Sequence, residues 1–226
     1  MPDETRSNSA DPRRPKLSGW DRLGRALFRA RGLTPIALVL IVILWPTGEG
    51  IGLRRLLVSV ALMVAGEAAR LCAVGTAGKC TRTRGDNVAE LVRSGPFARV
   101  RNPLYLGNFL LSYGLVALSR VGWLLWAFPI VFFFQYAAIV SWEEKTLSAR
   151  FGREYEEYRR SVPRWIPKPA RAAAAASHPF RADVAWRSER DTLRAAAAIV
   201  AVLLLKHFVF GDALTRFVLA ALRTGG

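Results

Sequence analysis

Two adjacent carboxylates and several arginines flank one apolar stretch of this sequence. Glu143 and Glu144 follow a long apolar run, and three arginines lie in the polar segments at either end of the stretch: Arg99, Arg101 and Arg164. Carboxylates accept hydrogen bonds from hydroxyl and amino groups, whereas guanidinium groups bind anionic groups. Aromatic residues that would suit a flat ring occur in the same segments: Phe97, Tyr105, Trp142, Tyr155 and Trp165. These residue types favour a site for a nucleoside-bearing cofactor, with apolar walls that would suit a lipid substrate.

Other kinds of catalytic site find little support. The sequence has no Ser-His-Asp set, no Cys nucleophile with a nearby base, and no phosphate-binding glycine loop. The two cysteines and two histidines have no metal-ligand spacing: Cys72, Cys80, His178 and His207. We therefore expect no metal site.

Two apolar helices are expected to bring the polar segments together. Residues 103–119 and 123–142 each read as a membrane span, and residues 120–122 as the turn between them. A hairpin returns the chain to the side that it left, so Arg101 and Glu144 should lie at the same membrane surface. Two glycines seven residues apart, Gly107 and Gly114, predict a narrow strip for close helix contact.

Three further apolar helices are predicted at residues 36–45, 54–74 and 193–210. Glu67 and Arg70, three residues apart on the second of these, should form an ion pair. The fold expected is an all-α polytopic membrane protein of about five transmembrane helices with a cytoplasmic-side cofactor pocket.

Three regions of the chain are expected. Residues 1–33 form a disordered tail and an amphipathic helix, which either lies in the membrane interface or packs on the core. Residues 34–168 form the membrane core, and residues 169–226 form a linker and an extra C-terminal transmembrane helix.

Positive charge indicates the orientation in the membrane. The chain has 33 Lys and Arg against 17 Asp and Glu. These cations crowd the N-terminal tail, the loop after the second span and the segment after the fourth, which predicts a cytoplasmic N-terminus and site in a multi-pass protein of the cytoplasmic membrane. The same distribution disfavours nucleic acid as a partner and favours membrane lipids.

Four motifs around the hairpin resemble those of a known family. They are G-P-F-x-x-V-R-N-P-L-Y-L-G at 95–107, E-E-x-x-L at 143–147, F-G-x-E-Y-x-x-Y at 151–158 and V-P-R-W-I-P at 162–167. In order and spacing they resemble the integral-membrane methyltransferases that include isoprenylcysteine carboxyl methyltransferases and phospholipid N-methyltransferases. The resemblance covers roughly residues 67–167.

The resemblance implies S-adenosylmethionine as cofactor, bound on the cytoplasmic side, and a lipophilic small-molecule or prenylated acceptor. It implies cofactor-binding roles for residues of all four motifs: Arg101, Asn102, Pro103, Tyr105, Gly107, Glu143, Glu144, Tyr155 and Tyr158. It also places Glu143, Glu144 and Arg164 at the catalytic centre.

The sequence departs from the family pattern at two positions. Many carboxyl-methylating members have His where this chain has Asn102, and eukaryotic members tend to have a basic residue where it has Ser161. An asparagine cannot titrate near neutral pH. Carboxyl O-methylation and amine N-methylation both stay open, as does the alternative of a non-catalytic membrane scaffold or lipid-binding protein that retains the methyltransferase fold.

Overall fold

The computed structural model describes residues 17–45, 51–78, 90–169, 179–210 and 220. The regular elements in these residues are all helical, which confirms the predicted all-α class. In chain order they are α1 (Gly19–Ala30), α2 (Leu33–Leu44), α3 (Leu53–Ala77), the 3-10 turn η2 (Gly95–Ala98), α4 (Pro103–Ser119), α5 (Leu124–Phe151), α6 (Arg153–Ser161), α7 (Ala182–Leu205) and the π-helical turn η3 (Lys206–Phe210).

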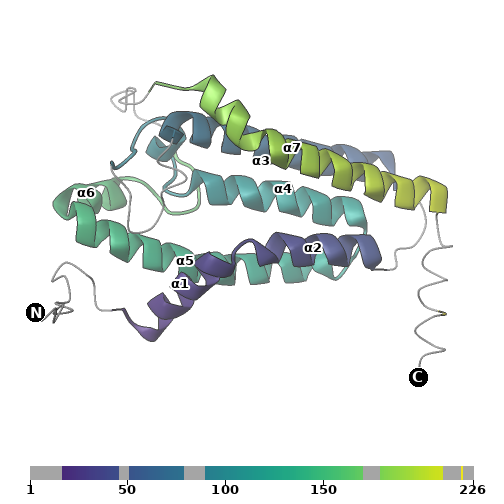
Figure 1. The fold of residues 1–226 in the computed structure, drawn as a ribbon, viewed down its shortest axis with the longest axis horizontal. Helices are drawn as coiled ribbons and strands as arrows, with labels where there is room; N and C mark the ends of the chain where they lie inside the picture. The colour runs from purple at the N-terminus through teal and green to yellow at the C-terminus, as the bar shows by residue number, and fades with distance from the viewer. Residues whose placement is uncertain (1–16, 46–50, 79–89, 170–178, 211–219, 221–226) are drawn as a thin grey trace, which may run out of the picture.

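The long helices lie side by side along one axis, with α4 in the middle (Figure 1). Helices α3 and α7 pack together on one side of α4, while α5 and α2 cover its other side. The start of α4, the end of α5 and α6 gather at one end of the bundle, so the polar motifs of the sequence share that end.

Glycines bring α3 and α4 into backbone contact. A Cβ added to Gly107 would lie 2.7 Å from the Gly66 carbonyl oxygen, and one added to Gly114 would lie 2.7 Å from the Ser59 carbonyl oxygen. Small residues allow this approach, in which dispersion contacts replace the hydrophobic effect that lipid cannot provide. The predicted glycine strip is confirmed, and its partner is α3.

Helix α1 packs on α5. A Cβ added to Gly24 would be 2.2 Å from the Ala138 carbonyl oxygen, so the two backbones touch. The ring of Phe28 lies 5.1 Å from that of Trp142. Helix α2 then turns away from α1 by 62°.

By length and composition, the described residues contain two helices able to cross a membrane, α3 and α5, or three if α1 and α2 count as one bent span. The predicted number of about five is therefore not reached by this criterion. Helix α4 is apolar but has only 17 residues. Helix α7 carries charged residues along its first half, including Asp183, Glu189 and Asp191.

Several predicted helix bounds are corrected. The predicted span at 123–142 is one part of a longer helix, α5, which starts at Leu124 and continues to Phe151, because good helix formers follow residue 142 and the first breaker after it is Gly152, with a φ of 51°. The last helix starts at Ala182 instead of residue 193, since the charged residues of the predicted linker form an amphipathic turn with Ala185 and Glu189 buried. The first sixteen residues of the expected N-terminal tail lie outside the described residues.

Candidate functional site

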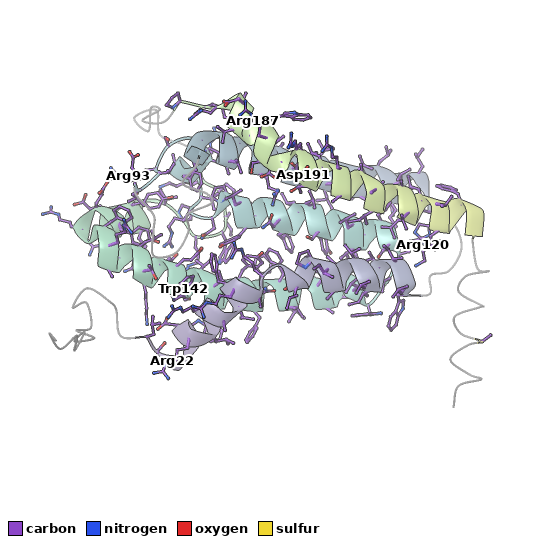
Figure 2. All side chains as sticks on the ribbon, viewed as in Figure 1. Arg22, Arg93, Arg120, Trp142, Arg187 and Asp191 are labelled. Atoms are coloured by element: carbon purple, nitrogen blue, oxygen red, sulfur yellow. The ribbon has the colours of Figure 1, made fainter. Side chains whose placement is uncertain are left out.

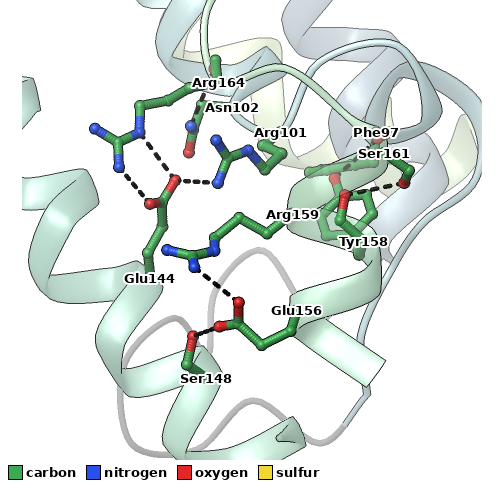
Figure 3. Close-up of polar contacts among 10 residues, drawn as sticks. All are labelled: Phe97, Arg101, Asn102, Glu144, Ser148, Glu156, Tyr158, Arg159, Ser161 and Arg164. Carbon is green, nitrogen blue, oxygen red and sulfur yellow. Dashed lines mark hydrogen bonds and ion pairs between the residues drawn. The ribbon is translucent and has the colours of Figure 1, made fainter. Parts of the chain in front are cut away.

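A buried carboxylate lies between two guanidinium groups at the polar end of the bundle. Glu144, on α5, accepts hydrogen bonds from Arg101 Nη1 at 2.7 Å and from Arg164 Nε at 3.0 Å, and Arg164 Nη2 binds its second oxygen (Figure 3). Arg101 lies two residues before the start of α4, and Arg164 follows α6. The contact confirms that the hairpin brings the Arg101 and Glu144 segments together.

The neighbouring carboxylate has a different partner. Glu143 Oε1 accepts a hydrogen bond of 2.9 Å from the hydroxyl of Tyr105, and both side chains are buried. The Tyr105 ring in turn lies 4.5 Å from the ring of Tyr136. The two adjacent glutamates therefore face two environments, one cationic and one aromatic.

Backbone contacts fix the segment that carries Arg164 across the start of α4. The amide of Arg101 donates to the Pro163 carbonyl at 2.9 Å, and the amide of Lys168 donates to the Arg99 carbonyl at 3.1 Å. Asn102, the N-cap residue of α4, donates its side-chain amide to the Arg164 carbonyl at 3.2 Å. Asn102 thus holds the chain that positions Arg164, and Pro103 fills the first turn of α4, where no N–H is needed.

Tyr155 and Tyr158 form a small apolar cluster with Val162. The Tyr158 hydroxyl donates to the Phe97 carbonyl at 2.8 Å. Burial raises the pKa of the Tyr155 hydroxyl, and the negative charge of Glu144 raises it further, so this hydroxyl stays protonated at neutral pH. Tyr158 thereby ties α6 to the η2 turn. Gly107 faces α3 and not the glutamates, with Gly66 and Arg70 against it.

One buried donor of the cluster lacks a partner. In the described part of the chain no hydrogen-bond acceptor lies within reach of Arg101 Nε. A buried N–H of this kind costs free energy unless a ligand or water satisfies it. The donor set therefore fits an added anionic group, such as a carboxylate, close to Glu144.

A pocket of about 240 Å³ lies on the Tyr105 side of the site. Tyr105 lines it and connects it to Glu143. The other lining residues come from five helices and the short link between α1 and α2: Phe28, Arg31, Arg70, Val74, Leu104, Asn108, Tyr136, Ser188 and Glu189.

Arg70 is the most connected side chain of the pocket. Its Nε donates to Glu189 Oε2 at 3.1 Å and lies 3.5 Å from Glu67 Oε2, and its two Nη atoms contact Asn108, Thr192 and Glu189 again. The Glu67–Arg70 ion pair was predicted from their spacing. The contribution of Glu189 was missed because its charged surroundings, S-E-R-D, read as linker. Asn108 directly follows Gly107, the last residue of the first motif, and this position in the sequence could have indicated that Asn108 lies near the site.

Within the described residues, no group of three or more His, Cys, Asp and Glu side chains could hold a metal ion.

Part of the chain is similar to known methyltransferases. Residues 54–154 match the family model described as phospholipid methyltransferase. A region of 110 residues is 30% identical to protein-S-isoprenylcysteine O-methyltransferase B of Arabidopsis thaliana, covering 47% of this chain and 56% of that protein. No solved structure matches the chain.

Two bacterial proteins are similar over a shorter region. The nickel-cobalt-cadmium resistance protein NccN of Alcaligenes xylosoxydans xylosoxydans is 33% identical over 84 residues, which cover 37% of this chain and 39% of that protein. The cobalt-zinc-cadmium resistance protein CzcN of Cupriavidus metallidurans is 33% identical over 78 residues, which cover 34% and 36%. The chain thus spans between 36% and 56% of the length of these curated relatives.

Proposed function

We propose that this chain, which matches the phospholipid methyltransferase family model over residues 54–154 and is similar to an isoprenylcysteine methyltransferase, is an S-adenosylmethionine-dependent methyltransferase. Its acceptor is a lipid-like or prenyl-type molecule at the membrane, methylated on a carboxyl oxygen or an amine nitrogen. The proposal extends from the shared segment to the whole chain.

The observation that carries the proposal is the Arg101–Glu144–Arg164 cluster at the end of the hairpin. The bound cofactor has a carboxylate and an amino group at one end and hydroxyls in its ribose. Arg101, whose Nε lacks a partner in the described residues, offers a donor for the carboxylate, and Glu144 offers acceptors for amino or hydroxyl groups. The residues therefore fit this cofactor. Tyr105 and Glu143 lie beside the cluster and would face the reacting groups.

When bound, the cofactor supplies a methyl group that is already strongly electrophilic, so the protein needs chiefly to position the reactants and to exclude water. A carboxylate acceptor needs no base. An amine acceptor must be neutral to react, and Glu143, held by Tyr105, can accept its proton. In this scheme the Tyr155 hydroxyl stays protonated and closes the cluster as a structural group.

We place this site at the membrane surface. The apolar helices α3 and α5 would anchor the core, residues 34–168, in a multi-pass arrangement, and the cations around the polar end would face the cytoplasm together with the N-terminus. Residues 1–33 and 169–226 would flank this core.

The alternative function, a non-catalytic scaffold or lipid-binding protein, has one observation in its favour. Both oxygens of Glu144 are already bound by arginines, and Tyr158 is bound to the backbone, as in a purely structural cluster. Labelled methyl transfer separates the two functions, because a scaffold would transfer no methyl group to any lipid fraction.

The test is titration of the purified protein with S-adenosylmethionine by calorimetry. We expect saturable binding by the wild type and its loss in Arg101→Ala, with the helical content unchanged by circular dichroism. The matched control is Arg153→Ala, an exposed arginine of α6. A folded wild-type protein that gives no binding heat would refute the enzyme proposal.

A further inference from the structure

The pocket beside the candidate site has walls from both ends of the chain. Helix α1 and the link to α2 contribute Phe28 and Arg31, and α7 contributes Ser188 and Glu189. These residues lie outside the segment that matches the methyltransferase family, residues 54–154. Figure 1 shows α1 and α7 on opposite sides of α4, and all three helices contribute lining residues to the pocket.

Two arginines line the pocket, and they differ in their partners. Arg70 is paired with Glu67 and with Glu189, and the buried Glu189 binds it through two nitrogens. Arg31 lies over the Phe28 ring at 3.9 Å and donates to the Phe28 carbonyl at 2.8 Å. Among the described residues no carboxylate lies within ion-pair distance of Arg31, which leaves its positive charge available to a ligand.

The remaining lining residues suit the rest of an amphiphile. Val74, Leu104 and Phe28 are apolar, while Asn108, Tyr105 and Tyr136 carry hydrogen-bonding groups. An anionic group beside Arg31 would gain a charge-assisted hydrogen bond, and an attached apolar chain would lie against the apolar wall.

Resting on the proposed function, we infer that this pocket binds the anionic head of the acceptor, a carboxylate or a phosphate on an apolar chain. Arg31 recognises the anion, and Glu189, together with Glu67, limits the positive charge of the pocket by pairing with Arg70. Acceptor choice would then be set by the flanking helices, while the shared segment carries the transfer chemistry.

The two residues have opposite expected effects, which makes the inference testable. Removing the charge of Arg31 takes away the cation that attracts the anion. Removing the charge of Glu189 leaves Glu67 as the one carboxylate still paired with Arg70 among the described residues, so more of the Arg70 charge attracts the same anion. A merely structural role would weaken binding in both cases.

The probe is a dansyl-labelled undecanoic acid, added to the full-length protein in dodecylmaltoside micelles and followed by tryptophan-to-dansyl energy transfer. We expect saturable binding by the wild type, about tenfold weaker binding by Arg31→Gln, and about threefold tighter binding by Glu189→Gln. The methyl ester of the probe should bind weakly and equally to all three. Competition by dodecanoate and by dodecyl phosphate tells which anion is preferred, and dodecylamine should not compete.

The controls are Arg22→Gln and Asp191→Asn, two exposed positions on the same helices that do not line the pocket (Figure 2). Both should bind the probe as the wild type does. Equal affinities of wild type and Arg31→Gln, weaker binding by Glu189→Gln, or effective competition by dodecylamine would overturn the inference. Calorimetry with S-adenosylmethionine on the same samples keeps the two proposals apart: cofactor binding without these probe effects refutes the inference alone, and probe effects without cofactor binding refute the enzyme proposal alone.

Discussion

Replacement of Glu144 by Gln tests the arrangement that joins the two halves of the candidate site. The glutamate is 6% exposed and binds two arginines. Breaking a buried ion pair from one side costs about 3–5 kcal/mol, because the remaining charge is left unpaired. The glutamine oxygen keeps one acceptor, and the Arg164 side chain is 35% exposed and can be hydrated. We therefore expect a loss of about 2–3 kcal/mol in the free energy of unfolding.

The assay is unfolding by SDS in mixed dodecylmaltoside micelles, followed by circular dichroism. A double-mutant cycle with Arg164→Gln isolates the pair: once Glu144 is gone, removal of Arg164 should cost little or become favourable. The coupling energy expected is about 1–2 kcal/mol. The control Glu157→Gln breaks an exposed pair with Arg153 on α6 and should change stability by less than about 0.5 kcal/mol.

Additive effects of Glu144→Gln and Arg164→Gln, within about 0.5 kcal/mol, would refute the reasoning. They would mean that the two side chains do not interact in the folded protein. The site would then lose the contact that ties the segment after α6 to α5.

Three further predictions concern single positions. Gly107→Val should destabilise the protein by about 3 kcal/mol or more, since its side chain would meet the backbone of Gly66, whereas Gly122→Ala, with open space around it, should be tolerated; SDS unfolding measures both. Tyr105→Phe should cost about 1–2 kcal/mol by leaving Glu143 without its buried hydroxyl donor, and equal stability of this variant and the wild type would contradict the contact. The folded-state pKa of Tyr155 is raised above its ordinary value of 10.0, so the unfolded chain loses this proton first and stability should fall as the pH rises above about 10. Tyr155→Phe should reduce that fall, as unfolding measured between pH 8 and 11 would show.

The hairpin and its ends were predictable from the sequence because their signals are local. Proline at position 103, a turn at 120–122 and a glycine at 152 mark boundaries that backbone geometry enforces. The meeting of Arg101 with Glu144 then follows from the return of the chain. The assignment of site residues to a cofactor stays a prediction.

The pocket was less accessible to sequence reasoning because its residues come together only through packing. Glu189 lies 119 positions from Arg70, and no periodic pattern connects them. The charged start of α7 looked like a linker because its apolar residues are few, yet burial of Ala185 and Glu189 against the bundle decides its structure. Arg31 belongs to none of the sequence motifs, and only its place in the pocket with Tyr136 and Asn108 distinguishes it.

The close contact between α3 and α4 has a consequence for motion. Backbones that touch at Gly66, Gly107 and Gly114 cannot slide or rotate past one another without collision, so this pair behaves as the stationary frame of the molecule. We therefore expect that any movement that opens the protein to a bulky ligand involves the outer helices. These are α1, which meets α2 at a bend of 62°, and α7. The rates of ligand entry and release would then be set by movement of α1 or α7, while α3 and α4 keep their positions.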